Sequence, residues 1–190
     1  MAASYHHGDL PNALVRAAVE LLEEGGSADL SLRAAARRAG VSTAAPYRHF
    51  PDRDALLSAV AAVGYRELAE QLVAAHPARA TPESLAVVAK AYVRFALSRP
   101  GMFRVMFADP AIPERDAAAA AIRDYVEMIV QQAFPESEPE PLAAAVWALV
   151  HGLAFLHLDG KLDASAPEVV ARQVESAAAA MLAATAREAE

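Results

Sequence analysis

Residues 41–57 read VSTAAPYRHFPDRDALL, and the composition of this stretch is unusual for the chain. It is polar and almost free of bulky aliphatic residues until its end, although 55% of the chain is hydrophobic. Two prolines lie five residues apart in it, with a Tyr-Arg-His group between them. Ser42 is a good helix cap and Pro51 a good terminator, so the stretch predicts a short, exposed helix followed by the start of another.

Two further helices are predicted before this stretch. Apolar residues recur at helical spacing over residues 10–24, and Gly25-Gly26 ends that pattern. Ser31 then caps the segment LRAAARRA, which stops at Gly40. A supporting helix, a second helix, a tight turn containing glycine and a short third helix form the arrangement of a helix-turn-helix DNA-binding unit.

The short helix after the turn is the one that enters the major groove in such a unit. Its first residues are small, so they reach base edges only through a hydroxyl and methyl groups, whereas the bulkier residues after Pro46 offer donors to the DNA backbone. Pro46 removes one main-chain hydrogen bond, so we expect a distorted first turn or a shifted start. The small residues are Thr43, Ala44 and Ala45, and the donors are Tyr47, Arg48 and His49.

The rest of the chain predicts an all-α protein of about nine helices in two domains. A long helix over about residues 52–75 connects a DNA-binding domain, residues 1–55, to a larger helical domain, residues 56–190. No strand-like alternation is seen. Later helices are expected from Thr81 to Ser98 and over residues 102–108, 113–133, 142–158 and 167–187.

Composition narrows the function classes. The net charge is -7, and the acidic excess falls after residue 50, so DNA binding requires a local basic face. The chain has no cysteine and its first residues do not resemble a signal peptide, which favours the cytoplasm. The uncharged run over residues 142–158 is shorter than the roughly 20 residues that span a bilayer, so we expect it to be buried between protein layers and predict no membrane contact.

Residues 9–57 resemble the N-terminal domain of the TetR family of bacterial transcriptional repressors, through the Val-Ser turn, the Tyr-x-x-Phe pair and the basic residue that opens the next helix. The resemblance implies that Tyr47, His49 and Arg53 touch phosphates. It also implies that residues 43–45 and Arg48 face the bases. The candidate DNA-binding residues are Arg33, Ser42, Thr43, Ala44, Ala45, Tyr47, Arg48, His49 and Arg53.

The second half resembles the subgroup with a WHG-type C-terminal domain. The resemblance is carried by YVRFALSRPGMFRVMF, residues 92–107, and by WALVHG, residues 147–152. It implies that the C-terminal domain binds a small effector and forms a homodimer through the helices over residues 142–158 and 167–187. The candidate effector-pocket residues are Phe95, Met102, Phe103, Met106, Phe107, Tyr125, Trp147 and His151.

Several residues keep two interpretations. Arg37 and Arg38 form either a solvated face or a DNA-backbone contact, and His151 is either a core histidine or a polar group in the effector cavity. His151 and His157 are six residues apart on a helix, so they cannot share a metal from one face. We also expect His6 and His7 to be disordered.

The sequence therefore favours a ligand-responsive repressor that binds a pseudo-palindromic operator as a homodimer, with reading helices about 34 Å apart. No nucleophile-base-acid grouping, metal-ligand spacing or phosphate-binding glycine loop is seen, so we predict no enzyme, no cofactor and no metal. An all-helical enzyme and a protein-binding helical adaptor are the alternatives. Turnover without DNA binding would favour the first, and negligible DNA affinity at any salt concentration the second.

Overall fold

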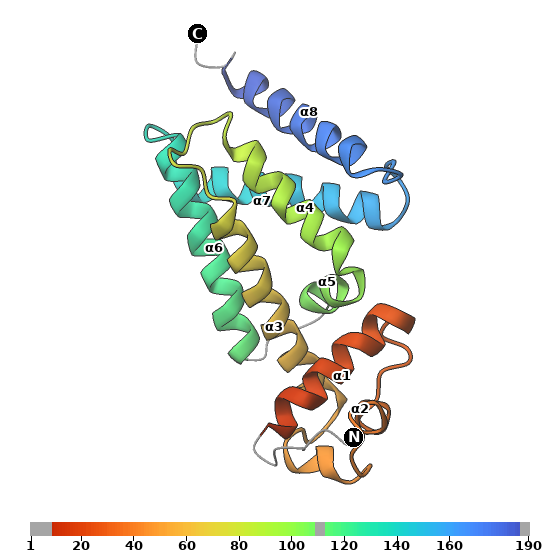
Figure 1. Ribbon diagram of the computed structural model, residues 1–190. Coiled ribbons are helices and arrows are strands. Elements are labelled where there is room, and N and C mark those ends of the chain that lie inside the picture. The colour runs from red at the N-terminus through yellow and green to blue at the C-terminus, as the bar shows by residue number, and fades with distance from the viewer. Residues whose placement is uncertain (1–8, 109–112, 187–190) are drawn as a thin grey trace. The chain divides into compact units, whose positions relative to one another are not determined.

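The computed structural model describes residues 9–108 and 113–186. Over these residues the chain forms eight α-helices and one 3-10 helix, with no strand, which confirms the all-α prediction (Figure 1). The 3-10 helix replaces one of the nine expected helices. The elements are α1 (Leu10–Gly25), α2 (Leu32–Arg38), η1 (Ala45–Arg48), α3 (Arg53–Ala74), α4 (Leu85–Ser98), α5 (Pro100–Phe107), α6 (Pro113–Ala133), α7 (Pro139–Leu158) and α8 (Pro167–Ala186).

The helices group into two compact units. The first comprises Met1–Tyr65 and Arg99–Ala118, and the second comprises Arg66–Ser98 and Ala119–Glu190. The chain therefore passes from one unit to the other three times, within α3, between α4 and α5, and within α6. The predicted helix-turn-helix elements share their unit with α5, a segment that comes about 50 residues later in the chain.

The cap predicted at Ser31 is present, and Asp52 supplies a second one at the start of the long helix. The backbone N–H of Ala34 donates to Ser31 Oγ over 3.1 Å at the start of α2, and that of Ala55 donates to Asp52 Oδ1 over 2.8 Å at the start of α3. The turn after α2 passes through Gly40, whose φ of 71° lies in the left-handed region that favours glycine. These local devices place η1 directly after α2, as the helix-turn-helix prediction requires.

Helix α5 is anchored to the end of α1. The backbone N–H groups of Gly101 and Met102 both donate to the carboxylate of Glu23, each over 3.1 Å. The approach is close, because a Cβ on Gly101 would lie 2.4 Å from the carbonyl oxygen of Leu22. A carboxylate that accepts the free N–H groups at a helix N-terminus is also favoured by the helix dipole.

In the second unit α4 packs against both α7 and α8 and contributes more buried residues than any other single helix of that unit. Helix α4 begins at Leu85, later than expected, because Thr81 and Ser84 hydrogen-bond to each other's backbone N–H and hold residues 82–84 in a turn. The start expected at Thr81 is therefore wrong by one turn.

Helix α7 is less buried than predicted. It has 20 residues and is apolar enough to cross a membrane by length and composition alone, yet only 28% of its most apolar window is buried. Its exposed side carries Pro141, Ala145, Ala148, Gly152 and Leu156, which recur every three or four residues and so share one face. The expectation that this helix is buried between protein layers is wrong for that face.

Candidate nucleic-acid interface

The segment after the turn is a 3-10 helix, η1, which begins at Ala45. Ser42 makes no side-chain capping bond; instead its carbonyl accepts the N–H of Ala45 over 3.0 Å. The expected distortion at Pro46 is confirmed, whereas the capping role of Ser42 is wrong. Pro46 supplies no N–H, and its carbonyl accepts the N–H groups of His49 and Phe50, each over 2.9 Å.

Burial orients this segment. Pro46 is buried and Phe50 is only 8% exposed, so these two residues anchor η1 to the core of the first unit. Tyr47, between the anchors, is 51% exposed, an unusual state for a large aromatic side chain. Of the other candidates here, Ala45 is half-buried and the rest are exposed: Ser42, Thr43, Ala44, Arg48 and His49.

The arginines of α2 divide into two kinds. Arg33 and Arg37 are exposed and have no ion-pair partner among the described residues. Arg38 instead donates to the carboxylates of Glu24 and Glu20 on α1, at 2.5 and 3.2 Å. The hydrogen bond from Arg38 lowers the pKa of Glu24. In return, the hydrogen bond to Glu24, and to a smaller extent the one to Glu20, raises the pKa of Arg38. Arg38 is therefore part of the α1–α2 contact, and Arg37 is the one of the pair available to DNA.

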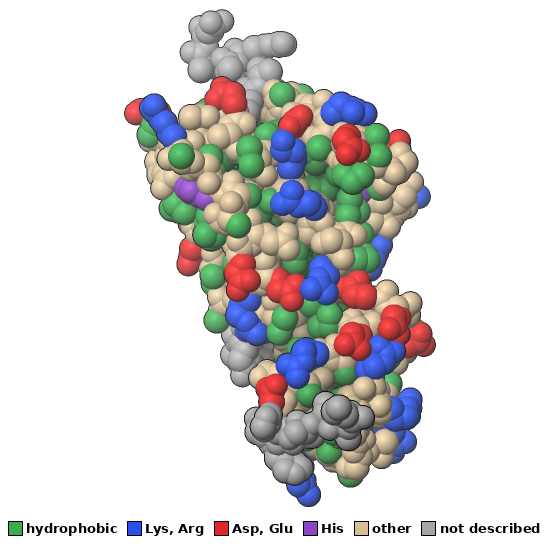
Figure 2. Space-filling view, in the orientation of Figure 1, with side chains coloured by type: hydrophobic (Ala, Val, Ile, Leu, Met, Phe, Trp, Pro, Cys, Tyr) green, Lys and Arg blue, Asp and Glu red, His purple; other side chains and the backbone are tan. Residues whose placement is uncertain are grey.

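Charge on the visible surface is mixed. Figure 2 shows basic side chains interleaved with acidic ones, without one dominant basic patch on that face. Two of the acids near α2 form ion pairs with Arg38, and Asp9 forms an ion pair with Arg16 at 3.3 Å. Pairing within the first unit therefore reduces repulsion of DNA phosphates by these carboxylates.

Arg53 has a structural role that the sequence did not reveal. Its Nε–H donates to the carbonyl of Leu30 over 3.0 Å, and its Nη2 donates to the carbonyl of Ser27 over 2.6 Å. These carbonyls belong to the loop between α1 and α2, more than 20 residues earlier in the chain. A guanidinium carries five N–H donors, so these bonds leave others for a phosphate.

Arg53→Ala is expected to lower the free energy of unfolding by about 1 to 3 kcal/mol, because two loop carbonyls lose charged donors. Urea unfolding followed by circular dichroism measures this change. Arg33→Ala removes an exposed arginine with no such bonds and is the control, with an expected change within about 0.5 kcal/mol. Equal stability of Arg53→Ala and the wild type would contradict the loop-bracing role.

The candidate effector residues fall in different units. Met102, Phe103, Met106 and Phe107 lie on α5 in the first unit, and the other four lie in the second. Met102, Phe103 and Met106 are fully buried, and the rings of Phe103 and Phe107 are 4.9 Å apart between centroids. Tyr65, which is not among the candidates, donates its hydroxyl to the carbonyl of Met106 over 2.8 Å.

In the second unit Trp147 and His151 meet Tyr92, another residue missed from the sequence. The Tyr92 hydroxyl lies 2.9 Å from His151 Nδ1, and Trp147 Nε1–H points to the same hydroxyl at 3.4 Å. Desolvation lowers the pKa of His151, so its neutral form is favoured. Tyr92 and Trp147 also line a cavity of about 40 Å³ with eight apolar neighbours.

The remaining two candidates are Phe95 and Tyr125. Phe95 is completely buried on α4. The Tyr125 hydroxyl donates to the carbonyl of Leu72 over 3.0 Å and lies 3.1 Å from His76 Nδ1, and burial raises the pKa of Tyr125. Across residues 9–108 and 113–186 no group of three or more histidine and acidic side chains could hold a metal ion. His6 and His7 lie outside the described residues.

Both halves of the chain match known protein families. A family described as bacterial regulatory proteins, tetR family, matches residues 14–60, and one described as tetracyclin repressor-like, C-terminal domain, matches residues 85–185. No curated protein matches. Among solved structures, a protein with unknown function from Rhodococcus sp. RHA1 is 34% identical, with 94% of this chain and 98% of that chain covered and a TM-score of 0.78.

Two more distant structures share the fold. A bacterial regulatory protein in the tetR family from Rhodococcus RHA1 is 21% identical, with 88% and 94% of the two chains covered and a TM-score of 0.67. The TetR family transcriptional regulator PfmR from Thermus thermophilus is 20% identical, with 87% and 96% covered and a TM-score of 0.65. At these identities the likeness concerns the fold alone.

Proposed function

Because the chain belongs to the TetR family, we propose that it is a cytoplasmic, ligand-responsive repressor. Members of this family are soluble DNA-binding transcriptional regulators and not enzymes. The protein binds a pseudo-palindromic operator as a homodimer and is released by a small effector. The observation that carries this proposal is the exposed segment from Ser42 to His49, which Pro46 and Phe50 anchor from beneath.

The proposed contacts with DNA follow from that exposure. Thr43 and Ala44 come first on the segment and are small enough to approach base edges, and Arg48 joins them on the base-facing side. Tyr47 and His49 donate to phosphates, together with Arg33 and the N–H groups of Arg53 that the loop leaves free. Few direct base contacts are available, so sequence-dependent DNA shape supplies part of the specificity.

The proposed dimer uses the exposed face of α7 together with the side of α8 that points away from α4. Both faces carry small residues, Ala145, Ala148 and Gly152 on α7 and Ala179 and Ala180 on α8. Small residues let helices from two copies approach closely. A Cβ added at Gly152 would meet nothing within 4 Å of one chain, so this position is open to a partner.

The effector is proposed to bind in the C-terminal domain, for which the WHG subgroup is our assignment. Trp147, His151 and Gly152 supply the letters of that name, and Tyr92 connects the first two by hydrogen bonds. Effector binding favours a dimer whose two DNA-binding domains are wrongly spaced for the operator. A coupling free energy of about 1 to 3 kcal/mol is enough for a 5- to 150-fold change in affinity.

Selection of bound DNA from a random pool tests the proposal. The wild type is expected to enrich two related half-sites whose centres are about one helical turn apart. Thr43→Ala should change the preferred base at one position per half-site and lower affinity for the wild-type site by about 5-fold, the value of one hydrogen bond. Ser137→Ala, in an exposed loop of the second unit, is the control. If the wild type binds all DNA sequences in the pool equally, it is not a sequence-specific regulator.

A further inference from the structure

A groove of about 680 Å³ lies between α4 and α8 in the second unit. Its volume falls within the range of small-molecule sites, roughly 300 to 1,000 Å³. The cavity beside Tyr92 and Trp147, at about 40 Å³, has room for only a few water molecules. The groove is therefore the better candidate for a ligand site in this state of the protein.

The walls of the groove are apolar. Val87 and Leu97 come from α4, and Val170, Ala171 and Val174 come from α8. In Figure 2 hydrophobic side chains are visible on the face that α4 and α8 form, beside basic and acidic ones. Such a surface suits the apolar part of a ligand, with polar groups at its margin to orient the rest.

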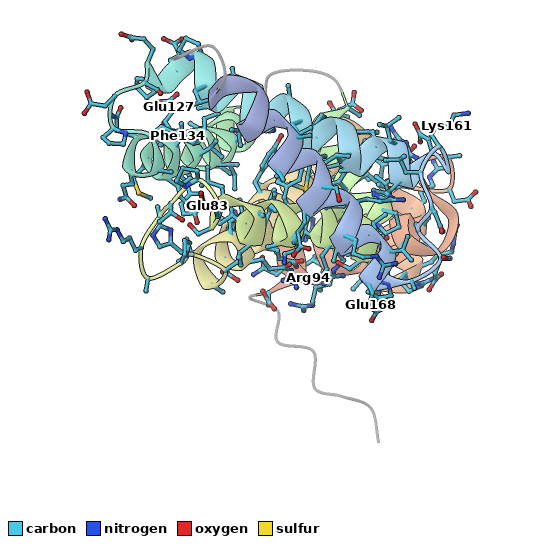
Figure 3. The ribbon with its side chains drawn as sticks, turned by 90° about the horizontal axis from the view of Figure 1, so that it is seen from above. Glu83, Arg94, Glu127, Phe134, Lys161 and Glu168 are labelled. Atoms are coloured by element: carbon cyan, nitrogen blue, oxygen red, sulfur yellow. The ribbon has the colours of Figure 1, made fainter. Side chains whose placement is uncertain are left out.

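Two basic side chains of α4 line the groove one helical turn apart. Lys90 donates to the carboxylate of Glu175 on α8, so its charge is already compensated. Arg94 is exposed and has no ion-pair partner among the described residues. Glu168 of α8 also lines the groove, and it forms no ion pair with Arg94 among the described residues. Figure 3 labels both side chains, along the lower side of that view.

We propose that the α4–α8 groove binds an amphipathic organic monoanion, with its carboxylate on Arg94 and its apolar part against the valines. This inference rests on the proposed function, because it names the chemical class of the effector. A guanidinium matches a carboxylate in a bidentate geometry, and here it is not already paired. Glu168 disfavours a second negative group in the groove, which restricts the class to single anions.

Octanoate and 1-octanol, which share an eight-carbon chain but differ in charge, are suitable probes for the full-length protein. Methyl chemical shifts of Val87, Val170 and Val174 report binding by nuclear magnetic resonance. Octanoate is expected to shift these methyls with an affinity about 10-fold higher than that of 1-octanol. Arg94→Gln should reduce the octanoate affinity to that of the alcohol and leave the alcohol unaffected.

Arg123→Gln is the matched control, because Arg123 is an exposed arginine of the same unit that does not line the groove. Arg94→Lys, which keeps the charge but loses the bidentate geometry, should retain part of the preference. Equal binding of the two probes by the wild type, an unchanged preference in Arg94→Gln, or shifts confined to methyls outside the groove would each overturn the proposal. Sequence-specific DNA binding is measured separately. If the protein selects a DNA site but shows no preference for octanoate, only the groove proposal fails. If it binds octanoate but selects no DNA site, the proposal that it is a transcriptional regulator fails.

Discussion

Gly101→Ala is expected to lower the free energy of unfolding by about 3 kcal/mol, because a Cβ at this position has no space. It would lie 2.4 Å from the carbonyl oxygen of Leu22 and 2.7 Å from its carbon, and both are backbone atoms that cannot rotate away. Helix α5 must therefore shift from α1, which lengthens the hydrogen bonds that Gly101 and Met102 donate to Glu23. Overpacking costs about 1 to 3 kcal/mol, and weakened bonds to a carboxylate add to that cost.

Thermal unfolding measures this effect, and for a chain of this length 3 kcal/mol corresponds to about 6 to 12 °C. Gly64→Ala is the matched control in the same unit. A Cβ on Gly64 would meet the Met106 sulfur at 2.6 Å and two atoms of Met102 at 2.9 Å, and flexible methionine side chains can move away. The gain of about 1 kcal/mol in helix propensity offsets part of the remaining strain. If the two variants unfold at the same temperature, the close approach of Gly101 to the Leu22 backbone does not determine the loss of stability.

Gly152→Glu is expected to abolish dimerisation and to reduce affinity for the selected operator by about 100-fold or more. Gly152 is exposed on α7, and one chain places nothing within 4 Å of a Cβ there, so a single folded chain tolerates the substitution. In the proposed dimer the same position lies between closely approaching helices, where a carboxylate would be buried without a partner. Separating the two copies removes the avidity of binding two half-sites, which is worth 10²- to 10⁴-fold.

Sedimentation velocity measures the oligomeric state, and fluorescence anisotropy with labelled operator measures the affinity. Ala121→Glu introduces the same charge on the exposed side of α6 and should remain dimeric with unchanged affinity. Circular dichroism verifies that both variants are folded. A dimeric Gly152→Glu protein with wild-type affinity would place the interface elsewhere.

Local chemistry explains what the sequence predicted well. Ser31 acts on an N–H group three residues away, so its cap could be predicted from the sequence. The cap at Asp52 has the same spacing, although only the helix start there was predicted. Pro46 likewise disturbs its own turn, and the expected distortion appears as a 3-10 helix. The exposure of Tyr47 agrees with the proposed role of the segment, although direct contact with DNA stays a prediction.

Long-range contacts explain what the sequence did not predict. Arg38 is neutralised by acids 14 and 18 residues earlier, and Arg53 braces carbonyls 23 and 26 residues earlier. Neither pairing leaves a local pattern that distinguishes these arginines from Arg33 or Arg37. Helix α7 is apolar all round, so periodicity could not reveal which face lacks a neighbour within the chain. The eight candidate effector residues were expected in one C-terminal domain, and the fold distributes them over two units.

Because α5 belongs to the first unit, the unit that carries the helix-turn-helix segment is not one continuous stretch of sequence. A fragment that stops at Tyr65 would lack the helix whose N-terminus Glu23 holds, and the Leu22 end of α1 would lose its cover. Grafting residues 1–65 onto a foreign effector domain should therefore give an aggregation-prone chimera. Chimeras that include residues 99–118 together with residues 1–65 are expected to fold. The segment that can be exchanged between such regulators is therefore larger than the motif proposed to contact DNA.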